Sequence, residues 1–383
     1  MLVRQTYLSG IDQARAALLP LAQLCPHLVL AFAPPEIMQN PRLFSTLVGQ
    51  IPGAKYFGCS TAGEIATPEL EGHGALITAI RFDQPDFRIA ESELRSMADS
   101  YTAGMRLGLK LAAPDLHAVV VLGCGLDING SALIEGLTQM VGEHVPITGG
   151  LAGDGERFQK TWVMSPLGVS AHKVAALGLY GNHWLFHHGC YGGWQPFGPL
   201  RRVTRASDNI LYELDGEPAL DIYKNYLGEY AAGLPASGLL FPFEMLDNSE
   251  ASQGVIRTIL GVDEAAGSLI LAGNVIPDGY LRLMYSSTDA LVEGAELAAR
   301  SVLAALPDRP DAALALLVSC VGRKLVMGER AEEEVESVAE ILGHQTALTG
   351  FYSYGEICPS QPSGVCQLHN QTMTITHLAE RQP

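Results

Sequence analysis

Three glycine-rich turns in the chain each end in a glycine followed by an acidic residue. They span residues 58–64, 149–154 and 350–356. Glycine lets the backbone adopt positive φ and bring its N–H groups close to a ligand. The acid at the end of each turn can accept hydrogen bonds from the turn itself or from a cationic group. The three turns have different side chains between the glycines, which indicates that one backbone conformation is repeated around a common site.

The side chains of these turns offer several kinds of ligand contact. The first turn supplies thiol and hydroxyl groups, and the third supplies aromatic walls with phenolic donors. If the turns converge, a small ligand with an amino or amide group fits Glu64 and Glu356. The candidate ligand-binding residues are Cys59, Ser60, Thr61, Gly63, Glu64, Gly150, Asp154, Tyr352, Tyr354 and Glu356. Alternatively, the glycines serve only tight β-turns and each acid caps a neighbouring N–H.

A histidine cluster at the end of one predicted strand could bind a metal or a haem. Alternation along the strand places Trp184, Phe186 and His188 on one face, and His183 and His187 on the other. Histidine is a common axial ligand of haem iron, and a ligand beside Trp184 and Phe186 would lie in an apolar pocket suited to a flat macrocycle. His188 is the first candidate and His183 the second, with His73 and His369 further away in the sequence. Alternatively, these are solvated or hydrogen-bonded strand-end residues.

A repeated order of helices and strands must position these groups. Three times a helix and a proline precede a continuously apolar strand, at residues 28–33, 118–124 and 313–320. Such strands are buried on both faces, as in a sheet covered by helices. A second helix, the glycine-acid turn and a pair of strands then follow. The predicted unit is therefore α-β-α-β-turn-β-β, present three times.

The pattern predicts an α/β fold with mixed sheets covered by helices, built from repeated α-β-α-β-β units in two domains. A Gly- and Pro-rich run at residues 192–199 indicates a boundary, so we expect domains of residues 1–205 and 206–383. Strand-like segments at 254–260 and 268–271 lie within a stretch of about 210–285. We interpret that stretch as a degenerate fourth copy of the unit.

Composition excludes several classes of protein. The chain has 383 residues, 48% of them hydrophobic and 17% charged, which is enough to bury a sizeable core. A formal net charge of −17 argues against binding to nucleic acid or to an anionic membrane. The seven cysteines are odd in number and form no C-x-x-C pair, which is typical of a reduced cytoplasmic protein.

The sequence carries none of the catalytic motifs that its glycines first suggest. Residues 58–63 do not form a G-x-S-x-G elbow, and no P-loop, H-E-x-x-H or EF-hand pattern occurs. A dinucleotide-binding fingerprint starting at Gly123 would need a third glycine where Ile128 stands. We therefore expect a binding protein and no enzyme.

The three turns, together with residues 210–219 and Tyr223, resemble FIST domain sensors over nearly the whole chain. That family has an N-terminal and a C-terminal FIST region. The resemblance implies an intracellular ligand sensor in prokaryotic signalling. Because the sequence shows no output domain, it also implies a partner in trans, either a sensor histidine kinase or a cyclic-di-GMP enzyme. The resemblance is also compatible with a homodimer.

Residues 187–199 are similar to the haem-containing, nitric-oxide-sensing members of that family. His188 stands where other members tend to have glutamine. The resemblance therefore implies haem b as cofactor, nitric oxide as the signal and His188 as the iron ligand. One alternative is a haem-free sensor of a small metabolite such as an amino acid. The other is an enzyme of unrecognised type that depends on Cys59, Ser60 or Glu64.

Overall fold

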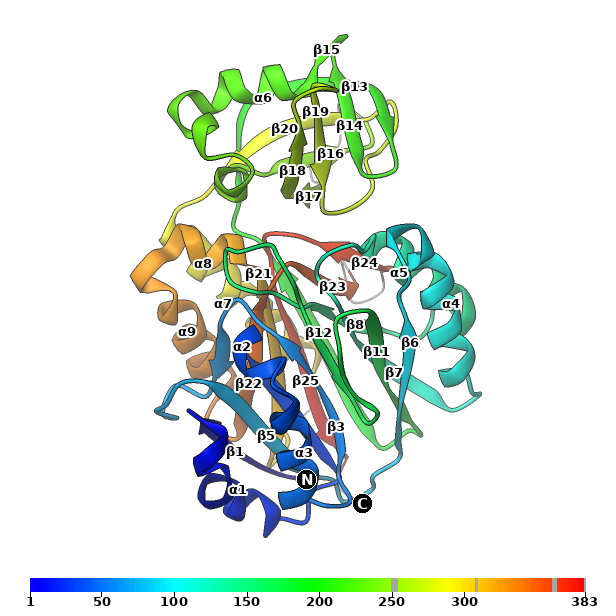
Figure 1. Ribbon diagram of the computed structural model, residues 1–383, viewed down its shortest axis with the longest axis vertical. Coiled ribbons are helices and arrows are strands. Elements are labelled where there is room, and N and C mark those ends of the chain that lie inside the picture. Colours follow the sequence, from blue (N-terminus) through cyan, green and yellow to red (C-terminus); the bar gives the residue numbers. More distant parts are fainter. Residues whose placement is uncertain (249–253, 307–308, 360–363, 382–383) are drawn as a thin grey trace.

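The computed structural model describes residues 1–248, 254–306, 309–359 and 364–381. The chain forms a large body and a smaller domain of residues 195–285, which lies at one end of the body (Figure 1). The predicted α/β class is confirmed, because helices cover mixed sheets throughout the body. Within the described residues, no helix has the length and apolar character needed to cross a lipid bilayer.

Three sheets of the body share one four-strand order, in which an edge strand is followed by an antiparallel strand and then by a parallel pair. In the first sheet these strands are β1 (Leu2–Leu8), β5 (Ala75–Arg81), β2 (Leu28–Ala33) and β3 (Lys55–Ser60). In the second they are β6 (Phe87–Glu93), β11 (Lys173–Tyr180), β7 (Leu116–Gly123) and β8 (Ile147–Leu151). In the third they are β12 (Trp184–Tyr191), β25 (Met373–Glu380), β21 (Ala313–Cys320) and β22 (Thr346–Ser353).

Each sheet is completed by a strand that belongs to another repeat. β9 (Val163–Ser165) of the second repeat pairs with β3, β23 (Gly355–Pro359) of the third pairs with β8, and β4 (Glu64–Ala66) of the first pairs with β22. The short strands β10 (Gly168–Ser170) and β24 (Cys366–His369) extend the first and second sheets. Because the exchange is cyclic, the three repeats close into a ring.

The strand pairs predicted after each turn do not pair with each other. β5 and β6 are consecutive in the chain, but β6 pairs with β11 in the next sheet. In the same way, β12 follows β11 and pairs with β25. Each repeat therefore begins with an edge strand, namely β1, β6 or β12. The predicted unit began one strand too late, since it assigned β6 and β12 to the end of the preceding copy. The alternation of residues along β6 does not show which strand it pairs with, because pairing with β5 or with β11 would bury the same face of β6.

The helices lie on the outer faces of these sheets. They are α1 (Ala14–Ala22), α2 (Pro35–Met38), α3 (Pro41–Gln50), α4 (Ser100–Leu111), α5 (Gly130–Val141), α7 (Thr288–Ala305), α8 (Val321–Met327) and α9 (Glu332–Leu342). Helix α5 illustrates why they form, because its buried residues Leu133, Leu137 and Val141 recur at helical spacing. At its start, Asn129 Oδ1 accepts a hydrogen bond from Ala132 N (3.1 Å), a cap of the kind that contributes about 1 kcal/mol.

A central core joins the inner faces of the three sheets. It contains Phe32 of the first sheet, Leu122 of the second, and Val318 and Phe351 of the third. The rings of Phe32 and Phe351 stack with their centroids 4.9 Å apart. Each central strand also packs its other face against helices, which explains why these strands are apolar at nearly every position.

The domain of residues 195–285 is built differently and is called the inserted domain below. Its antiparallel sheet has the order β17 (Val255–Arg257), β16 (Phe243–Leu246), β20 (Tyr280–Tyr285), β13 (Gln195–Ser207), β14 (Ile210–Leu214), β19 (Ser268–Leu271) and β18 (Ile259–Asp263). The strand β15 (Glu217–Pro218) and helix α6 (Ala219–Leu227) complete it, around a core of its own that includes Tyr223. The interpretation as a fourth copy of the unit was wrong, because these strands form no parallel pair. The predicted boundary between residues 205 and 206 falls inside β13.

Candidate functional site

The three glycine-acid turns meet in the body, where each contacts the other two. The links are Ser60 Oγ to Gly153 O (2.8 Å), Ala62 N to Tyr352 O (2.9 Å) and Tyr354 N to Leu151 O (3.1 Å). The turns therefore do converge, as the sequence suggested. They hold the ring of repeats together through direct hydrogen bonds to one another.

The first glycine of each turn is required by the sheet itself. A Cβ at this position would lie within 1.9 Å of a carbonyl oxygen on the parallel neighbouring strand. The pairs are Gly58 with Ala31, Gly149 with Val121, and Gly350 with Leu317. Because backbone oxygen cannot move aside as a flexible side chain can, glycine at these positions serves close backbone approach.

The acid of the second turn organises the loop that follows it. Asp154 is 2% exposed and accepts hydrogen bonds from the backbone N–H groups of Phe158, Gln159 and Lys160, at 2.8–2.9 Å. The Tyr354 hydroxyl also donates to Asp154. The carboxylate of Asp154 is thus occupied by protein donors.

The other two acids are engaged in a similar way. Glu356 is fully buried and accepts from Ser353 Oγ (2.5 Å) and from Thr372 N and Oγ1 (3.1 and 3.0 Å). Burial raises the pKa of Glu356 to about 8. Glu64 is half-buried and accepts from Thr61 Oγ1 (2.5 Å), and burial raises its pKa as well.

The remaining candidates of the turns are packed inside the protein. Cys59, Ser60 and Thr61 are at most 2% exposed, and Tyr352 and Tyr354 at most 4%. A Cβ at Gly63 would meet Lys324 Nζ, and one at Gly150 would meet Val318. A ligand at the turns would have to displace hydrogen bonds that already join them, so these residues are positioned chiefly to connect the repeats.

The histidine cluster is divided between several environments. His188 lines a large cavity and its Nδ1 lies 3.6 Å from Cys358 Sγ, while His369 lines the same cavity with Nε2 2.9 Å from Cys358 O. Burial lowers the pKa of each histidine to about 4, so both imidazoles are neutral near pH 7. Neutral imidazole is the form that binds a metal ion.

The other members of the cluster lie elsewhere. His183 Nε2 contacts Gln84 O (3.0 Å), and Trp184 is fully buried with Nε1 donating to Tyr180 O (2.8 Å). Phe186 packs on the central core. Trp184 shares a face of β12 with His188 but lies four residues away, about 13 Å along a strand. His73 is exposed in a loop of the first repeat.

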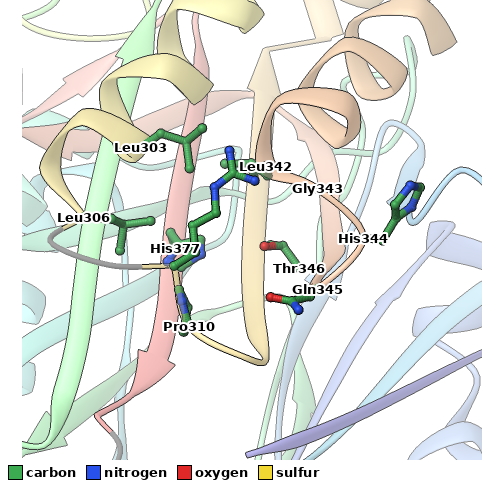
Figure 2. A pocket seen from close by; sticks show the side chains of 10 residues that line it. Leu303, Leu306, Pro310, Leu342, Gly343, His344, Gln345, Thr346 and His377 are labelled. Carbon is green, nitrogen blue, oxygen red and sulfur yellow. The ribbon is translucent and has the colours of Figure 1, made fainter.

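His187 lies opposite His377 in the pairing of β12 with β25. His377 is 1% exposed and borders a cavity of about 70 Å³, where Figure 2 shows it near Pro310, with Gln345 and Thr346 across the space. In the part of the chain that the structure describes, His377 Nδ1 has no hydrogen-bond partner. Burial lowers the pKa of His377 to about 4 and also lowers the pKa of His187.

Residues 192–194 and 286–287 link the inserted domain to the body. Ser286 Oγ donates to Gly193 O (2.8 Å), so the two linkers contact each other. Gly193 has φ +91°, and Trp194 Nε1 donates to Gln371 O of the body (2.8 Å). The inserted domain has a core of its own, and the two parts also meet outside the linkers, where Leu239 of the inserted domain packs into the core of the body.

The space between the inserted domain and the body forms the interdomain cleft, which has two chambers. The first chamber has a volume of about 1130 Å³ and contains His188 and His369 of the body. Its apolar walls include Trp194, Met284 and Leu297, and the ion pair of Arg282 with Glu244 (2.6 Å) lies on the side of the inserted domain. Ligand pockets in proteins typically have volumes of about 300–1,000 Å³.

The second chamber has a volume of about 810 Å³ and lies between the inserted domain and α5. Its polar residues include Arg257 of β17, and Ser131 and Thr138 of α5. Val255 and Gln367 line both chambers, so the two spaces adjoin. The cleft thus combines a chamber with neutral histidines and a chamber with a buried cation.

Sequence reasoning missed most of the cleft. Arg257 is the one charged residue of the short strand Val255–Arg257, and nothing in that pattern distinguishes it from an exposed strand end. Trp194 lies in the Gly- and Pro-rich run that indicated a domain boundary. The Gly- and Pro-rich run next to the histidine cluster was the one signal in the sequence that could have indicated a cleft between the two parts.

Comparison with known proteins gives the family of the chain. The FIST N domain model matches residues 27–217, and the FIST C domain model matches residues 219–359. An uncharacterized protein of Mycobacterium bovis is 28% identical over 311 residues, which are 79% of this chain and 71% of that protein. An uncharacterized protein of Methanocaldococcus jannaschii is 29% identical over 202 residues, which are 49% of this chain and 38% of that protein.

A solved structure, that of a cyanuric acid hydrolase from A. caulinodans, aligns with a TM-score of 0.40 at 10% identity, over 100% of this chain and 99% of that one. The two family models together cover the inserted domain and most of the body. The chain therefore belongs to the FIST family.

Proposed function

We propose that this FIST protein is a sensory signalling protein that binds its ligand in the interdomain cleft. The observation that carries this proposal is the first chamber, whose walls come from both the body and the inserted domain. A ligand that contacts both walls binds a closed cleft more tightly than an open one, and so shifts the population toward closure. The role is sensing, without catalysis.

The linkers provide a place for such a movement to occur. They join the body to a domain that has a core of its own, and Gly193 allows a backbone conformation that side chains disfavour. On the side of the body, Arg323 fixes the start of the first linker by donating to Gly192 O. Closure would therefore change residues 193–194 and 286–287 more than residues further along β12.

For the first chamber we propose haem b, with His188 as the iron ligand. The residues present fit this group, because His188 is neutral, faces the chamber, and has its Nδ1 beside Cys358 Sγ. Trp194, Met284 and Leu297 supply apolar walls for a macrocycle. When bound, the haem iron supplies a coordination position for a gas such as nitric oxide.

The absorption spectrum of the protein reconstituted with hemin tests this assignment. The wild-type protein should show a Soret band that shifts with nitric oxide, and His188→Ala should change or abolish it. His183→Ala is the matched control, since His183 immediately precedes the same strand and its Nε2 contacts Gln84 O, away from the chamber. A protein without a Soret band, or a His188→Ala spectrum identical to the wild type, would exclude haem.

For the output we propose a partner in trans, either a sensor histidine kinase or a cyclic-di-GMP enzyme, in the cytoplasm. The net charge of −17 supports docking on a basic surface of such a partner. Kinase autophosphorylation, measured with and without the protein, tests the first partner class, and sedimentation equilibrium tests a homodimer. A rate that is unchanged by the protein, in either ligand state, would exclude regulation of that kinase.

A haem-free sensor of a small metabolite is the second candidate function. The second chamber favours it, because that chamber contains no histidine among its described lining residues and has a buried arginine. The ligand class that this chamber suits is argued below.

A further inference from the structure

We infer that the second chamber binds a monocarboxylate with an apolar body, and that Arg257 holds the carboxylate of this ligand. The inference rests on the proposed role of the cleft as a ligand-binding site, and it names the chemical class that one chamber accepts.

Arg257 is buried and has no counter-ion among the residues that the structure describes. It is 7% exposed and donates only to backbone carbonyls, those of Leu368 (2.8 Å), Ile256 (3.3 Å) and Asn274 (3.4 Å). No carboxylate of the described residues forms an ion pair with it. By contrast, the buried Arg323 has Glu334 at 2.7 Å.

A buried charge without a partner is unfavourable, and burial lowers the pKa of Arg257 to about 10. A ligand carboxylate would supply the missing charge, and it could accept from Nη2, the nitrogen of this guanidinium that makes no hydrogen bond among the described residues. The side chain also lines the chamber directly, so a ligand there can reach it.

Two residues of α5 that line the same chamber have buried hydroxyl groups. Ser131 Oγ and Thr138 Oγ1 are buried atoms, and within the described residues neither makes a hydrogen bond. A Cβ added at Gly273 would lie 2.9 Å from both Ser131 Oγ and Arg257 Nε. Glycine at 273 thus allows the hydroxyl and the guanidinium to lie close to this part of the backbone. Ser131 lies in the first turn of α5, where the helix dipole favours an anion.

The other residues that line the chamber indicate that the rest of the ligand is apolar. Apolar side chains of both walls line it, including Ile134, Met245, Val275, Ile276 and Leu368. A volume of about 810 Å³ is far larger than a carboxylate group alone requires.

Two further lining residues, Glu135 and Glu143, carry exposed carboxylates that would repel a second negative charge. The chamber therefore suits one carboxylate on an apolar chain or ring, and disfavours phosphate esters and dicarboxylates.

Calorimetric titration with a panel of acetate, hexanoate, octanoate and benzoate, each beside its primary amide, tests the inference. At least one carboxylate with an apolar body should bind, and its amide should bind tenfold more weakly or worse. Arg257→Gln should weaken that binding at least tenfold. Arg205→Gln is the matched control, since Arg205 lies on the inserted domain in an exposed pair with Glu213 (2.9 Å), and it should leave the affinity unchanged.

Failure of the whole panel with the wild-type protein, or equal binding to Arg257→Gln, would overturn the inference. If Arg257→Gln does not fold, the double variant Ser131→Ala/Thr138→Val carries the test, because it keeps the arginine and should weaken binding severalfold. Hemin titrated into the same samples separates the two proposals. Hemin binding that depends on His188, without carboxylate binding, leaves the proposed function standing and excludes only this ligand class.

Discussion

Arg323 and Glu334 form an ion pair of 2.7 Å in which both side chains are fully buried. The same guanidinium donates to Gly192 O and to Leu291 O, and Ser319 Oγ donates to the Glu334 carboxylate. One pair of residues therefore joins α8, α9, α7 and β21 to the linker on which the inserted domain would move.

Glu334→Gln should destabilise the protein, because it leaves the Arg323 charge buried without its counter-ion. We expect the free energy of unfolding to fall by about 3–5 kcal/mol, measured by equilibrium denaturation with urea. Glu333→Gln is the control, since Glu333 pairs with Arg330 on the exposed side of α9 and should change stability little. A loss of less than about 1 kcal/mol for Glu334→Gln would show that the pair does not hold the linker.

Glu356 should make stability fall with rising pH just above neutrality. Its pKa is about 8 in the folded protein and about 4.5 in the unfolded chain, so the folded state keeps a proton that the unfolded state has lost. Unfolding free energy should therefore decrease toward pH 8, by up to about 1.4 kcal/mol per pH unit. The buried histidines have a pKa of about 4 in the folded protein and 6.5 in the unfolded chain, so their opposing contribution fades as the pH rises toward 8.

Urea unfolding of Glu356→Gln across that window checks this prediction. The variant should have a flatter dependence on pH than the wild-type protein, whereas Glu340→Gln, at an exposed position of α9, should keep the wild-type slope. Equal slopes for the wild type and Glu356→Gln would contradict a protonated Glu356 in the folded state.

His377 should act in the opposite direction, in acid. Burial lowers its pKa to about 4 from 6.5, so the unfolded chain binds a proton that the folded protein does not. Stability then falls as the pH drops from about 6.5 to 4. His377→Leu should lose less stability over this range than the wild type, by about 1 kcal/mol per pH unit. His172→Leu, at an exposed position, should lose as much stability as the wild type over this range. The same dependence of unfolding free energy on pH for all three proteins would contradict the role of His377.

Gly350→Ala should be strongly destabilising, because its Cβ would lie 1.8 Å from Leu317 O in the parallel strand. We expect a loss of more than about 3 kcal/mol in unfolding free energy, or failure to fold, since overpacking against backbone has no side chain to yield. Gly49→Ala is the matched control: it lies in α3 with open space around it, and should be neutral or stabilising by about 1 kcal/mol. A loss of unfolding free energy for Gly350→Ala as small as that of the control would mean that β22 can move away from β21.

The central strands, the outer helices and the three turns were predictable, because each depends on a local pattern. The apolar run at residues 313–320 and the glycines at 350 and 355 are visible in the sequence alone. The partner of an edge strand is not, since β6 would bury the same face against β5 or β11. The inserted domain was misread for a related reason, because a strand-like segment such as residues 268–271 does not show which strand it pairs with.

The cleft was harder to predict than the fold. Alternation along β12 correctly places His188 and Trp184 on one face, but their separation along the strand assigns them to different environments. The burial of Arg257 arises only when β17 packs beside Leu368 of the third repeat, 111 residues further along the chain. Long-range contacts of this kind leave no periodic trace in the sequence.

Hydrogen–deuterium exchange with hemin bound, and separately with the tightest-binding carboxylate, tests binding in the cleft most directly. Binding between the domains predicts slower exchange on both walls at once, in β16 and β17 of the inserted domain and in α7 for hemin or α5 for the carboxylate. Protection that appears instead at residues 58–64, 149–154 and 350–356, or on one wall alone, would contradict a sensor that closes over its ligand.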